Sequence, residues 1–355
     1  MERKTIVFIM PTMEGGGAER VIATLANGFT EHRFQVVVAL TQAKQSIYEL
    51  NSQIILEANP LNYSVEGQLR FIRRMLKKYK GSAFISFLTY QNMYTLLAGT
   101  GLRQRIIVSE RNDPATMLDG RNYLSGLRSF LYKRAERIVF QTKDAKKCFG
   151  KNIQRKGVII PNPIRNDLPE SYCGPREKRF VAYSRLDRQK NIPMMLKAFA
   201  KFSKKYSDYT LSIYGRGDEE EYLKSTARAL GLEQKVEFCG FSKNVHSEII
   251  KAAAFLSSSD YEGISNSMLE AMAIGLPCIC TDCPIGGTKM FIKDGWNGMM
   301  TAVGNADEMA EKMCRLAEDA SFSVCLSKNA SRIKDRLSAD MITRKWLTLL
   351  FPENS

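Results

Sequence analysis

Two glutamates separated by seven residues form the most specific chemical pattern of the chain. We expect Glu262 in a loop and Glu270 inside a helix that begins near Asn266 or Ser267, because both are favourable N-caps. Gly263 leaves the backbone free beside the cap, so several N–H donors and a helix dipole meet at one spot suited to a phosphate. The carboxylates can accept hydrogen bonds from sugar hydroxyls. The alternative is two surface carboxylates beside an ordinary capped helix.

A basic loop, Ser184 to Asn191, follows the first strand that we predict in the second half of the chain. Arg185 and Lys190 lie five residues apart in this loop. They can clamp a diphosphate, because arginine offers a planar fork of donors and lysine a point charge. A solvated basic loop is the alternative.

Three consecutive glycines, Gly15 to Gly17, separate the first predicted strand from the first predicted helix. They let the backbone approach a ligand closely, and the unpaired N–H groups of the following helix can receive an anion. The dinucleotide-binding fingerprint does not fit, because Arg20 stands where its third glycine belongs and residues 39–42 lack the acid that binds ribose. A plain tight turn is the alternative.

Short apolar runs alternate with segments of helical period, which predicts an α/β fold with parallel sheets covered on both faces. The series occurs twice, so we expect two doubly wound domains, with ligands bound beyond the carboxyl ends of the strands and in the cleft between the domains. The predicted strands are Thr5–Met10, Phe34–Leu40, Ala83–Leu88, Arg105–Ser109, Arg137–Gln141 and Val158–Ile160 in the first half, and Phe180–Ser184, Tyr209–Tyr214, Val236–Cys239, Ala253–Ser257, Pro277–Thr281 and Gly298–Thr301 in the second.

Two prolines around Asn162 mark the boundary between the domains, since neither a helix nor a central strand accommodates this pattern well. A polar stretch with further prolines, residues 165–178, is the predicted linker. We therefore expect one domain over residues 1–165 and a second domain over residues 166–335. A C-terminal helix within residues 336–355 is expected to pack back on the first domain.

The chain of 355 residues carries 52 lysines and arginines against 37 acidic residues, a net charge of +15. Residues 1–170 hold 26 basic and 14 acidic residues (+12), and the remainder holds 26 and 23 (+3). A basic first half favours phosphate-bearing partners or an anionic membrane, although many enzymes are basic for no specific reason. The hydrophobic (44%) and charged (25%) fractions exclude a disordered chain.

We expect the chain to remain in the cytoplasm. No stretch of about 20 residues is apolar enough to span a bilayer, and residues 1–6 lack the features of a signal peptide. The eight irregularly spaced cysteines are then reduced thiols. Residues 68–80 and 123–137 form two basic amphipathic segments that could dock the first domain on an anionic membrane; surface helices that merely cover a sheet are the alternative.

No metal and no other cofactor is expected. The chain has no Asp-x-Asp pattern, the usual carboxylate handle for a metal–diphosphate complex. Cys278, Cys280 and Cys283 have a metal-like spacing, but their apolar surroundings predict a buried strand and no fourth ligand is near.

The sequence resembles the retaining family 4, or group 1, glycosyltransferases. Its motifs match those of the family in the same order along nearly the whole chain. The matching motifs are Gly15–Arg20, Pro161–Pro163, Ser184–Leu186 with Lys190 and Asn191, Tyr214–Gly217, and the pair Glu262 and Glu270 followed by Gly275–Pro277. The resemblance implies the GT-B fold, two facing Rossmann-like domains with the donor held mainly by the second. It points to bacterial enzymes that add hexoses or N-acetylhexosamines to lipid-linked oligosaccharides for surface polysaccharides.

The resemblance also implies roles for individual residues. Arg185 and Lys190 would neutralise the diphosphate of a nucleotide-sugar donor and the charge on the leaving group. Glu270 would bind the ribose hydroxyls, and Glu262 would contact the donor sugar. No protein nucleophile is implied, because the acceptor attacks on the face from which the diphosphate departs; catalysis is then positioning and charge stabilisation. The other donor-binding residues implied are Gly16, Gly17, Gly215, Phe241, Gly263, Ile264, Ser265, Asn266 and Ser267.

One departure from the family concerns a histidine that many relatives carry after the fourth strand of the first domain, near the acceptor. The matching residues 108–113 contain none. Glu110 or Arg111 is the expected replacement on the acceptor side. Asn112 and Asp113 could equally form a turn before the proline that follows.

We therefore predict a retaining, metal-independent glycosyltransferase that uses a nucleotide sugar, expected to be UDP-linked. Its acceptor is a lipid-diphosphate-linked sugar or an oligosaccharide, reached at the inner face of the cell membrane. A nucleotide-sugar epimerase of the same fold is an alternative that the scarcity of histidine disfavours. A non-catalytic basic protein that binds a membrane surface or a nucleic acid is disfavoured because paired glutamates do not bind phosphodiester backbones. A dehydrogenase is disfavoured by the incomplete dinucleotide fingerprint.

Overall fold

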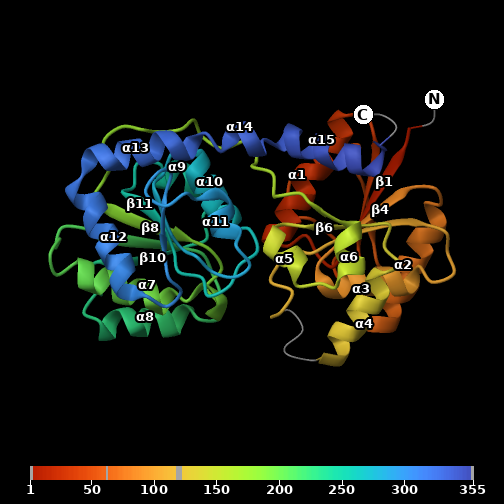
Figure 1. Ribbon diagram of the computed structural model, residues 1–355, viewed down its shortest axis with the longest axis horizontal. Helices are drawn as coiled ribbons and strands as arrows, with labels where there is room; N and C mark the ends of the chain where they lie inside the picture. The colour runs from red at the N-terminus through yellow and green to blue at the C-terminus, as the bar shows by residue number, and fades with distance from the viewer. Residues whose placement is uncertain (1–2, 61–62, 117–121, 353–355) are drawn as a thin grey trace. The chain divides into compact units, whose positions relative to one another are not determined.

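The computed structural model describes residues 3–60, 63–116 and 122–352 (Figure 1). The chain divides into two compact units: unit 1 comprises Met1–Pro163 with Leu337–Ser355, and unit 2 comprises Ile164–Arg336. The sequence places the corresponding boundaries after residues 165 and 335. Of the N-terminal segment weighed as a signal peptide, the first two residues lie outside the described part of the chain.

Unit 1 is built around a parallel sheet whose described strands follow the order β3-β2-β1-β4-β5-β6-β7. All but β3 coincide with predicted apolar runs. Strand β3 lies at the edge of the sheet with exposed or half-buried side chains, so it lacks the run of buried residues that reveals the others. The strands are β1 (Thr5–Met10), β2 (Gln35–Leu40), β3 (Ile55–Ala58), β4 (Ala83–Phe87), β5 (Arg105–Ser109), β6 (Arg137–Phe140) and β7 (Gly157–Ile159).

Unit 2 contains a second parallel sheet, with the described strands in the order β10-β9-β8-β11-β12-β13. Each of these strands falls on a predicted apolar run. They are β8 (Arg179–Tyr183), β9 (Thr210–Tyr214), β10 (Val236–Gly240), β11 (Ala254–Ser257), β12 (Cys278–Thr281) and β13 (Met299–Thr301). The two sheets confirm the predicted α/β class.

Helices follow the strands of both sheets, as Figure 1 shows. In unit 1 they are α1 (Gly17–Glu31), α2 (Val65–Lys78), α3 (Thr89–Ala98), α4 (Asn122–Tyr132), α5 (Lys143–Lys147), α6 (Lys151–Lys156) and α15 (Ala339–Leu350). In unit 2 they are α7 (Ile192–Phe202), α8 (Glu220–Ala229), α9 (Val245–Ile249), α10 (Asn266–Ala273), α11 (Gly287–Phe291), α12 (Ala306–Glu318) and α13 (Ala320–Ser331), with the short α14 (Lys334–Leu337) at the end of the unit.

Helix α10 begins at Asn266, where the sequence predicts it, but its cap differs from the prediction. The N-cap is Ser265, whose hydroxyl accepts a hydrogen bond from the Met268 N–H at 3.3 Å. The predicted caps, Asn266 and Ser267, lie in the first turn instead. All three residues are short and polar, so composition alone does not select among them.

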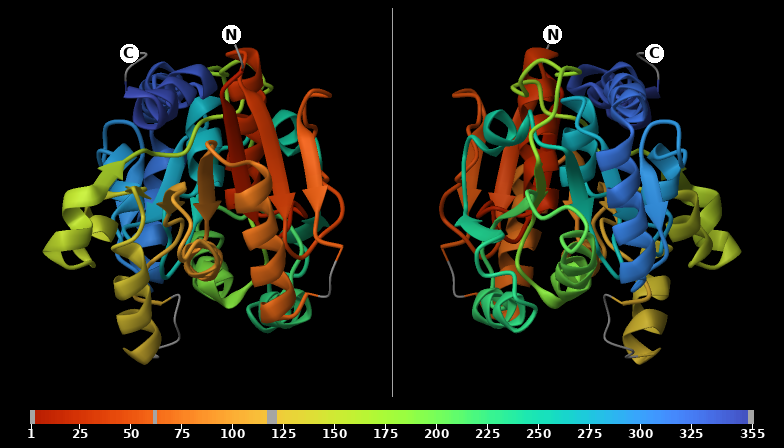
Figure 2. Two further views of the ribbon diagram at one scale, coloured as in Figure 1. Left: turned by 90° about the vertical axis from the view of Figure 1, so that its right-hand side faces the viewer. Right: turned by 90° about the vertical axis from the view of Figure 1, so that its left-hand side faces the viewer.

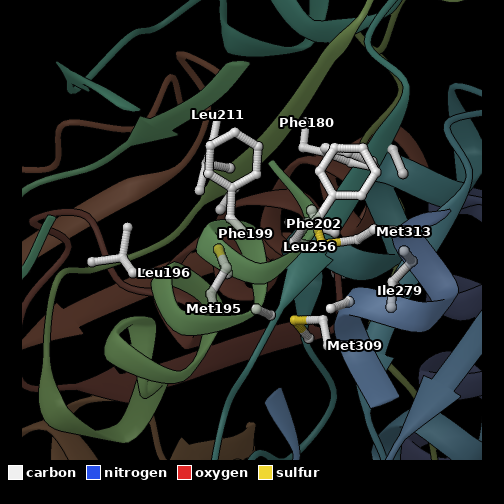
Figure 3. Close-up of a cluster of buried hydrophobic side chains, with 14 of the residues drawn as sticks. Phe180, Met195, Leu196, Phe199, Phe202, Leu211, Leu256, Ile279, Met309 and Met313 are labelled. Atoms are coloured by element: carbon white, nitrogen blue, oxygen red, sulfur yellow. The ribbon is translucent and has the colours of Figure 1, made fainter. Parts of the chain in front are cut away.

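A cluster of buried apolar side chains stabilises unit 2 between its sheet and helices α7 and α12 (Figure 3). Phe180 and Leu211 come from β8 and β9, Phe199 and Phe202 from α7, and Met309 from α12. The rings of Phe180 and Phe202 meet edge to face with 5.1 Å between their centroids. Since burial of each such side chain contributes about 1.5–3 kcal/mol, this core fixes the strands whose ends carry the candidate site.

The last helix of the chain, α15, belongs to unit 1 and packs on α1. Its Trp346 is fully buried and stacks on Phe87 of β4 with 5.9 Å between ring centroids. Gly28 of α1 faces Thr343 of α15 without a side chain between them. The left view of Figure 2 shows α15, in dark blue, close to the red N-terminal strand and helix.

Helix α2 contains most of the first amphipathic segment. Its Phe71, Ile72, Met75 and Leu76 are buried in unit 1, where α2 packs on α3, so their apolar surface is already covered by the unit itself. The alternative interpretation, a helix that covers a sheet, therefore holds for residues 68–80. In the described part of the chain, no helix has the length and apolar character needed to cross a membrane.

We expect Gly28→Ala to lower the free energy of unfolding by about 1–3 kcal/mol, the usual range for overpacking a core. A Cβ at this position would lie 2.5 Å from Thr343 Oγ1, and Thr343 is fully buried. Equilibrium denaturation with urea measures the change. Gly126→Ala in α4 is the matched control, because no atom lies within 4 Å of its added Cβ.

The control variant should be neutral or slightly stabilised through helix propensity. Adding Thr343→Ala to Gly28→Ala removes the clash and should recover most of the loss. An undiminished loss in the double variant would contradict the steric cause.

Candidate functional site

Polar residues of unit 2 gather where its parallel strands end. The loop after β8 carries residues 184–191, and the loop after β11 carries residues 258–265. Because β8 and β11 are neighbours in the sheet, both loops leave it at the same edge, side by side. This adjacency brings together the basic loop and the glutamate loop, which the sequence separates by some 70 residues.

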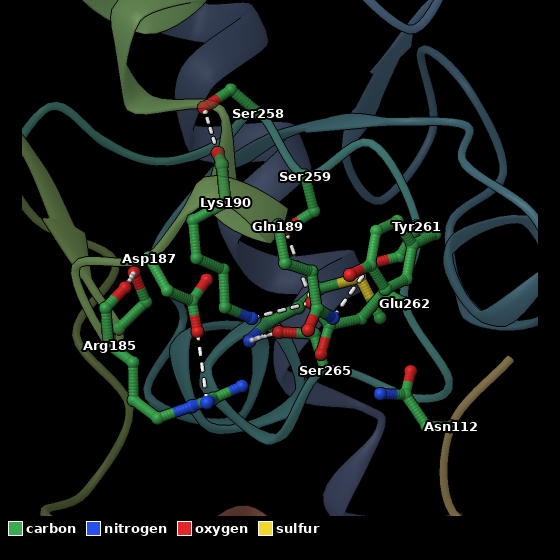
Figure 4. Close-up of polar contacts among 12 residues, drawn as sticks. Asn112, Arg185, Asp187, Gln189, Lys190, Ser258, Ser259, Tyr261, Glu262 and Ser265 are labelled. Carbon is green, nitrogen blue, oxygen red and sulfur yellow. Dashed lines mark hydrogen bonds and ion pairs between the residues drawn. The ribbon is translucent and has the colours of Figure 1, made fainter. Parts of the chain in front are cut away.

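Lys190 and Glu262 form an ion pair, with 2.5 Å between Lys190 Nζ and Glu262 Oε2 (Figure 4). Their side chains are only 14% and 18% exposed. The hydroxyl of Ser259 donates to the same carboxylate oxygen at 3.1 Å, and Gln189 Nε2 lies 3.5 Å from it. A pair so largely withdrawn from water and backed by further donors holds both charges in one geometry.

The backbone around Lys190 is fixed by the glutamate loop. The Ser258 hydroxyl donates to the Lys190 carbonyl at 2.8 Å. The next residue, Asn191, adopts a left-handed conformation (φ 41°), caps α7 and donates to Asp260 Oδ1 at 2.7 Å. Sequence analysis identified none of Ser258, Ser259 or Asp260 as supporting residues, because their partners lie far away along the chain.

Arg185 is held less tightly than Lys190. Its Nη1 lies 2.9 Å from Asp187 Oδ2, and its side chain is 64% exposed. An exposed ion pair of this kind contributes little to stability, so the guanidinium fork can turn towards an anionic ligand at small cost.

Gly215 allows the loop after β9 to pack directly on the basic loop. Its φ is 142°, and a Cβ at this position would collide with the Ser184 carbonyl oxygen. The amide of Ser184 donates to the Tyr214 carbonyl at 3.0 Å, and the amide of Gly215 donates to the Gly240 carbonyl at 2.8 Å. The predicted donor-binding Gly215 therefore supports the basic loop through its backbone.

The N-terminus of α10 borders a recess in unit 2. Tyr183, Lys190, Ser259, Ser265 and Ser267 are among its lining residues. Behind it, the Gly263 carbonyl lies so close to Gly287 that any larger residue at position 287 would displace the loop. The predicted phosphate-binding segment 263–267 and the Lys190–Glu262 pair thus share one edge of the sheet.

Glu270 is buried, 3% exposed, one turn further along α10. Its Oε2 lies 2.9 Å from Nε2 of His246, which belongs to α9. No sequence pattern singles out His246, because the two residues are 24 positions apart on different helices. Phe241, one of the donor-binding residues that the resemblance implies, lies on the loop after β10 and is 57% exposed.

The three clustered cysteines are buried thiols. Cys278 and Cys280 lie within β12, and Cys283 follows it. Burial raises the pKa of Cys283 to about 12 and that of Cys280 well above its usual value. Among the described residues, no group of three or more histidine, cysteine, aspartate or glutamate side chains is arranged to hold a metal ion.

The glycine turn of unit 1 is occupied by a carboxylate from its own chain. The amides of Gly15 and Gly16 donate to Glu19 Oε2 at 2.7 Å and 2.6 Å, and the hydroxyl of Thr12 donates to the other oxygen. Glu19 is 8% exposed. The amide of Gly16, predicted to approach a diphosphate, thus already satisfies a carboxylate; Gly17 opens helix α1 directly behind it.

Glu110 and Arg111 follow β5 in unit 1 and are both buried. Glu110 accepts hydrogen bonds from Thr89 (2.7 Å) and from the hydroxyl of Tyr132, and burial raises its pKa. Arg111 donates to Asn162 Oδ1 at 2.9 Å and lies 3.9 Å above the ring of Phe87.

Burial lowers the pKa of Arg111 to about 9. Its Nε and Nη2 atoms have no hydrogen-bond partner among the described residues. Of the two candidates for the acceptor side, Arg111 therefore has unused donors, whereas the carboxylate of Glu110 is engaged within unit 1 on both oxygens.

The two parallel sheets have the arrangement of the GT-B fold, which solved structures of glycosyltransferases share. Residues 168–333 match the family model for the group 1 glycosyl transferases. This match lies within the second unit and agrees with the resemblance that the sequence motifs indicate.

Two solved structures and two proteins of known sequence illustrate the similarity. HepE of Anabaena, solved with UDP, is 17% identical with a TM-score of 0.80 over 98% of this chain and 99% of its own. Sucrose-phosphate synthase of Thermosynechococcus elongatus is 14% identical with a TM-score of 0.85 over 98% of each chain.

In sequence, the chain is 26% identical to an α-1,4-N-acetyl-D-galactosaminyltransferase of Campylobacter jejuni that acts on an undecaprenol-diphosphate-linked saccharide, over 97% of this chain and 98% of that protein. It is 25% identical to an uncharacterized glycosyltransferase of Haemophilus influenzae, over 98% of this chain and all of that protein. The two similarities extend over both units.

We expect Gly215→Ala to lower the melting temperature by about 4–8 °C, as a loss of about 2 kcal/mol does in a unit of this size. The added methyl group would displace the Ser184 carbonyl and with it the basic loop. Gly231→Ala is the matched control, since Gly231 also has a positive φ (70°) but no atom within 4 Å of the added Cβ. Differential scanning calorimetry measures both; equal shifts would show that strain at positive φ, and not the close approach, causes the loss.

Proposed function

We propose that the chain is a retaining glycosyltransferase that moves a hexose or an N-acetylhexosamine from a UDP-linked donor to a hydroxyl group of a lipid-linked saccharide. The observation that carries the proposal is the Lys190–Glu262 ion pair beside the N-terminus of α10, with Arg185 on the same basic loop. Cations and helix N–H groups suit a diphosphate, and the carboxylate suits sugar hydroxyls. All of them belong to loops at one edge of one sheet.

In the proposed reaction, Arg185 and Lys190 stabilise the negative charge that develops on the departing nucleoside diphosphate. The ion pair with Glu262 keeps the Lys190 ammonium in place before the donor binds, so little reorganisation is needed during the reaction. Glu262 receives hydroxyl groups of the transferred sugar, and Glu270 receives the ribose. The acceptor hydroxyl attacks on the face that the diphosphate leaves, which retains the anomeric configuration without a protein nucleophile.

We propose that the two cations of the basic loop take over the charge neutralisation that a divalent metal ion would otherwise supply, so that transfer needs no metal. On the side of unit 1, Arg111 is the proposed replacement for the family histidine. Its buried guanidinium keeps unused N–H donors, and an anionic oxygen of a ligand would satisfy them.

Two similarities support the choice of substrates. The Campylobacter jejuni relative transfers N-acetylgalactosamine to an undecaprenol-diphosphate-linked saccharide. HepE, the pneumococcal GtfA and a Staphylococcus aureus TarM variant, which share the fold, have each been solved with UDP. A UDP-sugar donor and a lipid-diphosphate-linked acceptor are therefore the proposed substrates.

We expect Lys190→Ala to reduce transfer by about 10²-fold, because removing one group that stabilises developing charge costs about that much. Glu262→Ala should cause a loss of about the same size, because it removes both a contact with the sugar and the partner that holds Lys190 in place. The assay presents UDP-hexoses and UDP-N-acetylhexosamines to an undecaprenyl-diphosphate-linked saccharide and follows the product by mass spectrometry. Lys205→Ala is the matched control, since it breaks an exposed Lys205–Glu318 pair of similar length (2.6 Å).

The control should transfer at the wild-type rate, and circular dichroism should show that all three variants are folded. Unchanged turnover in Lys190→Ala or Glu262→Ala would remove the role assigned to that residue. Nuclear magnetic resonance of the product gives its anomeric configuration; an inverted product would exclude the retaining mechanism.

We further propose that helix α4 contacts the anionic inner face of the cell membrane, where a lipid-linked acceptor lies. Tyr123, Leu127 and Phe130 are 71%, 45% and 56% exposed, and their spacing places them on one face of the helix. Lys133 and Arg134 follow them, both exposed. Exposed apolar side chains next to cations suit the boundary between acyl chains and anionic headgroups.

The double variant Leu127→Asp/Phe130→Asp is expected to lose flotation with vesicles of phosphatidylglycerol and phosphatidylethanolamine at low salt. The loss follows because carboxylates at the apolar face oppose both insertion and attraction to anionic lipid. Tyr222→Asp changes an equally exposed aromatic residue (56%) in unit 2 and should float like the wild type. Absence of wild-type flotation at low salt would exclude membrane contact through α4.

A further inference from the structure

A histidine and a glutamate of unit 2 form a buried hydrogen-bonded pair. Nε2 of His246 lies 2.9 Å from Oε2 of Glu270, and the two side chains are only 9% and 4% exposed. A ring N–H donates to a carboxylate oxygen, so this contact can fix the carboxylate in one orientation. The pair joins α9, which follows the loop of Phe241, to α10.

Tyr183 at the end of β8 completes this connection. Its ring meets the His246 ring edge to face, with 5.5 Å between centroids and 86° between the planes. Its hydroxyl donates to the Ser267 carbonyl at 2.6 Å, on the same helix as Glu270. Tyr183, which lines the recess, thus contacts both the imidazole ring and the helix that carries the carboxylate.

We propose that His246 is a positioning residue that sets the orientation of the Glu270 carboxylate for recognition of the donor's ribose hydroxyls. A carboxylate on an unbranched side chain can rotate about its terminal bonds, and a hydrogen bond to one oxygen fixes the directions in which both oxygens accept. Removing the ring would take one donor away from a buried carboxylate, which weakens the hold on its present orientation. This inference rests on the proposed role of Glu270 in binding ribose.

The experiment compares UDP with dideoxy-UDP, which lacks both ribose hydroxyls, by isothermal titration calorimetry. The wild type should bind UDP about tenfold more tightly, the value of one hydrogen-bonded contact with a charged group. His246→Ala should lose most of this preference, as Glu270→Ala does, while its affinity for dideoxy-UDP stays unchanged.

Two further variants sharpen the comparison. His246→Gln keeps an N–H donor of similar reach and should recover part of the preference for UDP. His32→Ala is the matched control, because it removes the other histidine of the chain, which pairs with Asp340 in unit 1 at 3.0 Å. It should bind both ligands like the wild type.

The outcomes separate the inference from the function on which it rests. If Glu270→Ala loses the preference but His246→Ala keeps it, the positioning role is overturned and the ribose contact stands. If His246→Ala weakens both ligands equally, its effect is structural and the positioning role is also overturned. A wild type that binds both ligands equally would overturn the ribose role of Glu270 itself. Should His246→Ala not fold, His246→Phe fills the same space without a donor, and the same outcomes decide.

Discussion

The ion pair between Lys190 and Glu262 is the interaction on which the rest of the candidate site depends. Withdrawing two charges from water costs several kcal/mol for each ion, and only close geometry with additional hydrogen bonds offsets this cost. Ser259 supplies one such bond, and Gln189 anchors the loop through the Tyr261 carbonyl at 2.8 Å. Apolar residues often stabilise such a position as well as an ion pair does, so stability alone does not account for these two charges.

Strand order explains how this pair forms. A doubly wound sheet places loops from distant parts of the sequence at one edge, and the reversal of order at β8 puts the loops after β8 and β11 side by side. The close backbone approach at Gly215 then presses the basic loop against the loop after β9. Main-chain packing thus sets the position of the Lys190–Glu262 pair, whereas the exposed Arg185 side chain on the same loop keeps its freedom to turn.

Much of the fold follows from sequence because parallel strands buried on both faces are continuous apolar runs. The exposed edge strand β3 escapes this rule, and the choice of Ser265 over Asn266 as the cap depends on backbone angles that composition does not contain. Motifs identified Arg185, Lys190, Glu262 and Glu270, yet the partners that hold them, such as His246, are chosen by contacts between distant segments. Sequence patterns therefore indicate candidate site residues more readily than the residues that orient them.

The sequence pattern also does not show which of two adjacent polar residues has its hydrogen-bonding groups satisfied within the fold. Glu110 and Arg111 are adjacent, but successive side chains at the end of a strand point to opposite faces of the sheet. Glu110 therefore contacts Thr89 and Tyr132, which donate to its carboxylate. Arg111 contacts the ring of Phe87 and donates to the side-chain oxygen of Asn162. Aromatic rings stabilise a buried guanidinium only in part. An anionic ligand that reached Arg111 would supply the hydrogen-bond acceptors that its Nε and Nη2 atoms lack within the described part of the chain, whereas a cation already paired with a carboxylate would gain less from the same ligand.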